Sequence, residues 1–190
     1  MNNKYIIILF CSVVASFSFS QKIGRITPEV GLKFPYVGFT IGANVKVVSA
    51  LEMGVGVDLN ATYTLGRWFE VKYFVGESFK GCQFKKNQFF ISSQLNSSSS
   101  GKYLDEYNEK FSTYKISEGL YLNFGGGYRR NSLLKNDKVV GGYIKTHFQG
   151  AIKSSNYVLI EGVENVKIER SLNRNLGNYF FISIGFYFVL

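Results

Sequence analysis

Residues 37–47, VGFTIGANVKV, alternate strictly between apolar side chains and glycine or polar side chains. A period of two residues is typical of a β-strand, in which successive side chains point to opposite faces. The next stretch, residues 51–63 (LEMGVGVDLNATY), repeats this period. The two segments therefore predict neighbouring strands, each with one apolar face and one face of small and polar residues.

The same alternation recurs along most of the chain. Clear strands are predicted over residues 36–48, 50–64, 66–79, 114–129, 139–152 and 178–190, and weaker ones over 23–34, 83–95 and 155–168. The clear segments reach the roughly 9–11 residues that a tilted strand needs to cross a bilayer, whereas soluble strands average about 5–6. Single-chain bacterial barrels have an even number of strands. We therefore expect a barrel of eight strands, with ten as the alternative.

The polar face contains glycine, asparagine, threonine and serine, with charges of both signs among them. Small residues suit the crowded inside of a narrow barrel, mixed charges can pair there, and the aliphatic and aromatic face suits lipid. This pattern predicts an all-β fold, a closed antiparallel transmembrane β-barrel. A soluble, secreted, lipocalin-like barrel that binds a ligand is a further alternative, and it would fill its interior with apolar residues. The side chains expected to line the lumen are Lys46, Glu52, Asp58, Glu70, Lys72, Lys145 and His147.

Aromatic residues and polar segments mark the ends of the predicted strands. Residues 95–110, LNSSSSGKYLDEYNEK, predict a long solvated loop, and residues 129–138 and 169–178 predict further polar connections. Aromatic residues near strand ends are typical of girdles at the membrane interface. The aromatic residues in such positions are Phe34, Tyr36, Tyr63, Trp68, Phe79, Tyr128, Tyr157, Tyr179 and Tyr187.

The first twenty residues have the pattern of a secretory signal peptide that is cleaved before Gln21. Lys4 supplies the positive charge, and residues 5–14 (YIIILFCSVV) form an apolar stretch that is too short to span a bilayer core of about 30 Å. The expected organisation is a signal peptide over residues 1–20 and one barrel domain over residues 21–190.

The composition argues against several kinds of site. The chain is 46% hydrophobic and 18% charged, with a formal net charge of +9, one histidine and two cysteines. Cys82, the single cysteine after the signal, leaves too few ligands for a Cys/His metal site, and His147 lies in no catalytic motif. We therefore expect no enzymatic activity and no cofactor. The basic residues form no cluster typical of nucleic-acid binding. Those expected in loops, either solvated or on lipopolysaccharide head groups, are Arg129, Arg130, Lys135, Lys138, Arg170 and Arg174.

The signal, the glycine-spaced strands and the terminal segment YFFISIGFYFVL (residues 179–190) resemble small porin-like outer-membrane β-barrel proteins of Gram-negative bacteria, in particular those of Bacteroidota. The resemblance covers most of residues 22–190. It implies a location in the outer membrane, in contact with lipid and lipopolysaccharide. It also implies an assembly signal at Phe186, Phe188 and Leu190 for the barrel-assembly machinery, with Leu190 in place of the usual phenylalanine.

The resemblance implies a porin-like function, the passage of small solutes. The alternative is a plugged barrel with a structural role or a role in binding through its surface loops. Side chains alone can fill the interior of an eight-stranded barrel, and the charges expected in the lumen could close it by pairing.

Overall fold

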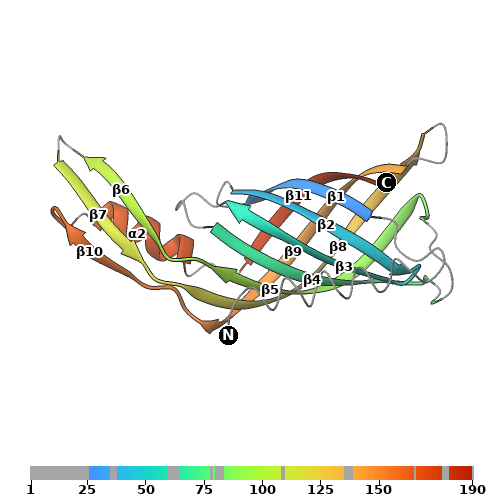
Figure 1. The fold of residues 1–190 in the computed structure, drawn as a ribbon, viewed down its shortest axis with the longest axis horizontal. Helices are drawn as coiled ribbons and strands as arrows, with labels where there is room; N and C mark the ends of the chain where they lie inside the picture. The colour runs from blue at the N-terminus through green and yellow to red at the C-terminus, as the bar shows by residue number, and fades with distance from the viewer. Residues whose placement is uncertain are drawn as a thin grey trace.

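The computed structural model describes residues 26–34, 38–59, 65–77, 79, 84–107, 110–134, 139–164, 166–176 and 180–189. Eight strands close into a barrel in the order β1-β11-β9-β8-β5-β4-β3-β2, and three others form a separate sheet in the order β10-β7-β6 (Figure 1). The predicted closed barrel of eight antiparallel strands is confirmed, and the alternative of ten is wrong. The predicted signal peptide, Cys82 and Leu190 lie outside the described residues.

Every neighbouring pair of barrel strands is antiparallel. The last strand closes on the first with Val30 opposite Phe186, so that the wall has no free edge. Pro28 lies within the first strand and does not interrupt it. The barrel strands are β1 (Ile26–Phe34), β2 (Gly38–Val48), β3 (Leu51–Leu59), β4 (Leu65–Phe74), β5 (Asn87–Ser98), β8 (Gly119–Leu133), β9 (Val139–Lys153) and β11 (Phe180–Val189).

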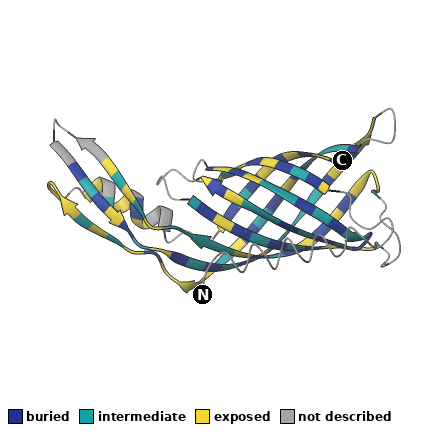
Figure 2. Ribbon diagram, in the orientation of Figure 1, coloured by how far each residue is buried: buried dark blue, intermediate teal, exposed yellow. Residues whose placement is uncertain are grey.

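Buried and exposed residues alternate along these strands (Figure 2). Polar side chains are among the buried residues, and apolar side chains are among the exposed ones. In β2, for example, Thr40, Asn44 and Lys46 are buried, whereas Phe39 and Ile41 are exposed. A globular core has the reverse distribution, because water-soluble proteins bury their large apolar residues. The period of two residues seen in the sequence therefore sorts polar side chains to the inside of the barrel.

Three strands of the barrel wall lead into the second sheet. β5 leads into β6 (Gly101–Tyr107), β7 (Lys110–Ile116) leads into β8, and β9 leads into β10 (Tyr157–Glu161). The order β6-β7-β10 therefore repeats the order β5-β8-β9 of the wall. The helix α2 (Val166–Leu176) packs against this sheet. We call β6, β7, β10 and α2 the accessory unit.

A small core of its own holds the accessory unit together. Leu172 of α2 packs with Tyr114 and Ile116 of β7, and all three side chains are buried. Tyr157 and Leu159 of β10 pack against the same core. In the part of the chain that the structure describes, no helix has the length and the hydropathy needed to cross a membrane.

The accessory unit shows that four predictions are wrong. The predicted strand over residues 114–129 is two strands, because β7 ends at Ile116 in the second sheet and β8 begins at Gly119 in the barrel. The predicted loop over residues 95–110 is largely strand, because β5 runs to Ser98 and β6 follows it. The predicted polar connection over residues 169–178 contains most of α2. The predicted strand over residues 155–168 contains only the short β10 and the start of α2, and it takes no part in the barrel. Packing between these distant segments stabilises structure that their polar composition does not reveal.

The two ends of the barrel differ. β1 begins and β11 ends at one end, which also carries the connections β2–β3, β4–β5 and β8–β9. The accessory unit lies at the opposite end (Figure 1). We call these the turn end and the accessory end.

Candidate functional site

All the residues predicted to line the lumen lie inside the barrel. Each of these side chains is charged or titratable, and each residue is at most 5% exposed. Alternation directs them inward from β2, β3, β4 and β9. They are Lys46, Glu52, Asp58, Glu70, Lys72, Lys145 and His147.

Lys72 lies at the centre of a charge network in the lumen. Its Nζ is 3.2 Å from Glu29 Oε2, 3.3 Å from Glu52 Oε1 and 3.5 Å from Glu70 Oε2. The ammonium also donates a hydrogen bond of 3.0 Å to Asn44 Oδ1, whose Nδ2 donates to Glu29 Oε2 at 2.8 Å. Three carboxylates from β1, β3 and β4 thus converge on one ammonium group, which compensates charges that would be costly to bury singly.

Two further cations extend this network across the lumen. Arg129 Nη1 is 2.7 Å from Glu52 Oε2, and Lys145 Nζ is 2.8 Å from Glu70 Oε2. Glu52 and Glu70 each also face Lys72, so the ion pairs connect β3 and β4 with β8 and β9. With Glu29, three acidic and three basic side chains balance each other inside the barrel.

A second ion pair lies nearer the accessory end. Lys33 of β1 pairs with Asp58 of β3, and Asn96 Nδ2 of β5 donates to Asp58 Oδ2 at 3.2 Å. The Lys33 ammonium also lies 5.0 Å from the centre of the Phe181 ring. Polar contacts therefore cross the lumen at more than one level.

Aromatic rings fill the lumen toward the turn end. Lys46 Nζ lies 4.2 Å from the centre of the Phe74 ring and 4.9 Å from that of Phe84. The Arg129 guanidinium lies 4.0 Å from the same Phe74 ring and 5.4 Å from the Tyr187 ring. Cations over aromatic faces are attracted by the ring quadrupole, most strongly where water is excluded. These rings and cations occupy the inside of the barrel between the charge network and its turn end.

The Trp68 side chain lies in the lumen against β2 and β3, where glycines leave space for it. A Cβ atom at Gly42 or Gly56 would overlap the indole ring. The indole Nε1 donates to Thr40 Oγ1 at 3.1 Å, which satisfies its one polar atom. The predicted place of Trp68 and Tyr187 in an interfacial girdle is therefore wrong, because both side chains are buried inside the barrel.

The other predicted girdle residues have several different environments. Phe34 and Phe79 are exposed, Tyr128 is half-buried, and Tyr157 packs in the accessory unit. Tyr36, Tyr63 and Tyr179 lie outside the described residues.

The space left at the centre of the network is small. A cavity of about 10 Å³ lies between Glu29, Glu52, Lys72, Arg129 and Tyr143, among other residues. One water molecule needs roughly 10–15 Å³ by this measure. Glu29 Oε1, Arg129 Nη2 and Tyr143 OH are buried without a hydrogen-bond partner within the described part of the chain. This cavity accommodates at most a single water.

Ser92, His147 and Glu70 bring together the residue types of a hydrolytic triad. Ser92 Oγ lies 2.8 Å from His147 Nε2, but Glu70 Oε1 lies 3.4 Å from the same nitrogen. In a triad the carboxylate bonds the other ring nitrogen and orients the imidazole toward the serine. The imidazole is also fully buried. The three side chains therefore form part of the internal polar network, and they lack the geometry of a catalytic triad.

The sequence patterns missed Glu29, Lys33 and Arg129 as residues of the lumen. The prediction that Arg129 and Arg130 are loop cations is wrong, because both lie in β8, which continues to Leu133. Arg129 is buried beside Glu52, and Arg130 is exposed on the outer face. Asn123, Arg129 and Asn131 all stand at odd positions of the same strand. This shared parity could have indicated that Arg129 points into the lumen with the two asparagines. Glu29 follows Pro28 in a segment that had only a weak strand pattern.

No family model, curated protein or solved structure matches this chain. Within the described ranges, no group of three or more His, Cys, Asp or Glu side chains is arranged to hold a metal ion.

Proposed function

We propose that this protein is an integral β-barrel of the bacterial outer membrane, of the small porin-like type, whose lumen is closed. It acts through the accessory unit as a structural or binding protein, without catalytic chemistry. The single observation that carries the proposal is the distribution of polarity, with ion pairs inside the barrel and exposed apolar side chains outside it.

The outer wall supports a membrane location. Many exposed apolar side chains on one wall are unfavourable in water but suit the hydrocarbon of a bilayer. Barrel strands of 9 to 15 residues are long enough to cross it. A soluble lipocalin-like barrel would have the opposite distribution. The exposed apolar residues on this wall include Val30, Leu32, Ile41, Val57, Ile91, Leu95, Phe124, Ile144, Phe148, Ile184 and Phe186.

The filled lumen favours the plugged alternative over the passage of solutes. Lys72, Arg129 and Lys145 each pair with a carboxylate on another strand. The cavity beside Lys72 and Arg129 takes no more than one water. A conducting pore needs a hydrated path from one end to the other. Opening such a path here would require several buried ion pairs to separate together, which is costly in a low dielectric.

The accessory unit is the part best suited to act outside the membrane. Long outer connections of membrane barrels face the cell exterior, while short turns face the periplasm. Leu104, Val158 and Ile160 are exposed on this unit. They provide an apolar surface for a structural or binding contact beyond the barrel.

The proposal is tested by adding the purified mature chain to a planar lipid bilayer and recording current. Insertion is checked separately by protection of the barrel from protease in liposomes. We expect an inserted barrel with no stepwise conductance. Stepwise currents would overturn the closed lumen, whereas a folded protein that does not insert would overturn the membrane location.

A further inference from the structure

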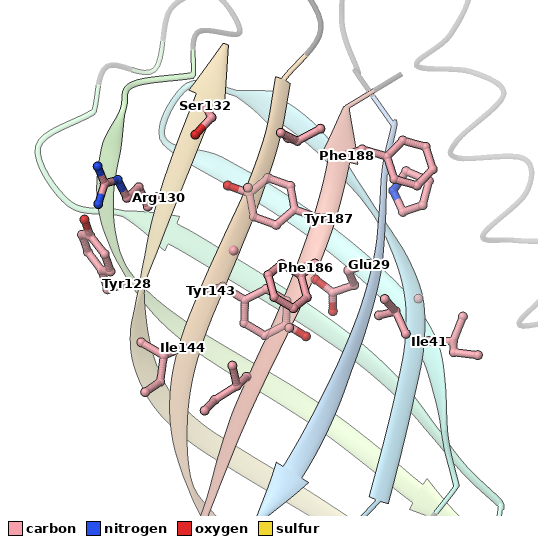
Figure 3. Close-up of a pocket in the computed structure, with 18 residues that line it drawn as sticks. Glu29, Ile41, Tyr128, Arg130, Ser132, Tyr143, Ile144, Phe186, Tyr187 and Phe188 are labelled. Atoms are coloured by element: carbon pink, nitrogen blue, oxygen red, sulfur yellow. The ribbon is translucent and has the colours of Figure 1, made fainter. Parts of the chain in front are cut away.

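The outer wall of the barrel has a groove where one row of side chains is interrupted by a glycine. The groove has a volume of about 840 Å³ and lies over β8, β9, β11, β1 and β2 (Figure 3). Gly142 of β9 lies opposite Arg130 of β8 and opposite Phe186 of β11. Paired residues project to the same face of a sheet, and so a position without a side chain lies between a guanidinium group and an aromatic ring.

The groove is apolar along most of its length. Tyr128 and Arg130 lie along one side of it, Phe186 and Phe188 belong to its middle strand, and Ile41 lies toward the other side (Figure 3). Both phenylalanines are exposed, Phe186 to 71%. The volume is within the range of roughly 300–1,000 Å³ that binding sites for small organic molecules occupy. Walls of this chemistry favour a hydrocarbon chain.

Arg130 adds a positive charge on one side of the groove, toward the turn end. Its side chain is exposed, and no described acidic side chain forms an ion pair with it. The neighbouring Tyr128 hydroxyl already donates to Asn87 Oδ1 at 2.7 Å. The guanidinium is therefore available for an anion, and its planar donors match a phosphate.

The position of Arg130 along the barrel agrees with a phosphate ligand. β8 ends at Leu133 at the turn end, three positions beyond Arg130. Long basic side chains near the ends of membrane-spanning segments reach the interface, where lipid phosphates lie. The apolar part of the groove extends from there toward Ile144 and Ile184 in the middle of the wall.

We propose that this groove binds one anionic phospholipid from the leaflet at the turn end. One acyl chain lies over Gly142 between Tyr128 and Phe186, and the phosphate binds Arg130. The inference rests on the proposed membrane location of the barrel and adds to it a specific lipid site.

Two substitutions separate the two parts of the site. A Cβ atom at Gly142 would have only ordinary contacts, the nearest being Gly185 O at 3.6 Å and Phe186 Cδ1 at 3.7 Å. Gly142→Leu should therefore fill the groove while the barrel still closes. Arg130→Gln removes the charge and keeps a polar side chain. Val57→Leu is the matched control, because Val57 is exposed on β3 and does not line the groove.

The measurement is native mass spectrometry of the folded barrel from detergent micelles that contain phosphatidylglycerol or phosphatidylcholine. We expect one retained phosphatidylglycerol on the wild-type protein and on Val57→Leu. Gly142→Leu should weaken binding of both lipids about tenfold, and Arg130→Gln should abolish the preference for phosphatidylglycerol. Equal lipid retention by all four proteins would overturn the site.

Three other outcomes also decide the question. A doubled mass for the wild-type protein that Gly142→Leu abolishes would identify a second copy of this chain as the occupant and overturn the lipid. A barrel that inserts into liposomes but binds lipid independently of Gly142 overturns only this inference. A folded barrel that does not insert overturns the proposed function itself.

Discussion

Arg129 Nη1 donates a hydrogen bond of 2.7 Å to Glu52 Oε2 across the inside of the barrel, which joins β8 to β3. Both side chains are buried, and Glu52 also faces the Lys72 ammonium. Removal of one partner would leave an uncompensated charge in a site from which water is excluded. The pair therefore belongs to a network whose members depend on one another.

The first prediction concerns this pair. Glu52→Gln should lower the free energy of unfolding by about 3–5 kcal/mol, because it leaves Arg129 and Lys72 short of a counter-charge. The double variant Glu52→Gln, Arg129→Gln should lose less than the sum of the two single variants. The free energies of unfolding of the two single variants and the double variant are measured by urea titration in detergent micelles, followed by tryptophan fluorescence. Additive losses would contradict the coupling between the two side chains.

The second prediction concerns glycines that face opposite sides of the wall. Gly42→Val should destabilise the barrel by about 1–3 kcal/mol or prevent its closure, since its Cβ would overlap the Trp68 ring. Gly142→Val is the control, because its Cβ has ordinary contacts only, and it should change stability by less than about 0.5 kcal/mol. Thermal unfolding followed by circular dichroism compares them. Equal effects would contradict the assignment of inner and outer faces.

The third prediction concerns the accessory unit. Leu172→Ala should destabilise this unit by about 2–5 kcal/mol, because it removes a fully buried side chain from the core with Tyr114 and Ile116. The barrel shares no side chain of that core and should keep its stability. Limited proteolysis and amide hydrogen exchange would show faster cleavage and exchange in α2 and β10 alone.

Val166→Ala is the matched control for that experiment, since Val166 is exposed on the same helix. It should leave proteolysis unchanged. A loss of protection in β1 to β4 on Leu172→Ala would contradict the separation of the two parts.

Much of the barrel was predictable because the alternation of apolar and polar residues indicates both a β-strand and the face to which each side chain points. Lys46, Glu52 and Lys72 could be assigned to one face by parity alone. The position of Trp68 inside the lumen could not be predicted in this way. It depends on which residues of β2 and β3, namely Gly42 and Gly56, lie beside the indole, and hence on the register between strands. Register is determined by pairing between strands, which a single sequence does not reveal.

The accessory unit was not predictable for a related reason. Its core joins Leu172 to Tyr114 and Tyr157, which lie in segments of polar or mixed composition far apart in the chain. Local pattern favours loops there, and only tertiary packing stabilises the strands and the helix. Arg129 was misassigned because a polar run follows it, although its strand continues to Leu133.

The most direct test of the central claim measures which residues of the barrel contact lipid. Single cysteines replace Phe124 or Val158 in a chain that begins at Gln21 and carries Cys82→Ser. Each cysteine is labelled with an environment-sensitive fluorophore, and the labelled protein is placed in liposomes. Phe124 lies on the outer wall of β8 and Val158 on the accessory unit, and both are exposed. Brominated lipids should quench the label at position 124 and leave that at position 158 accessible to iodide. Quenching of both labels by iodide alone would contradict the membrane barrel.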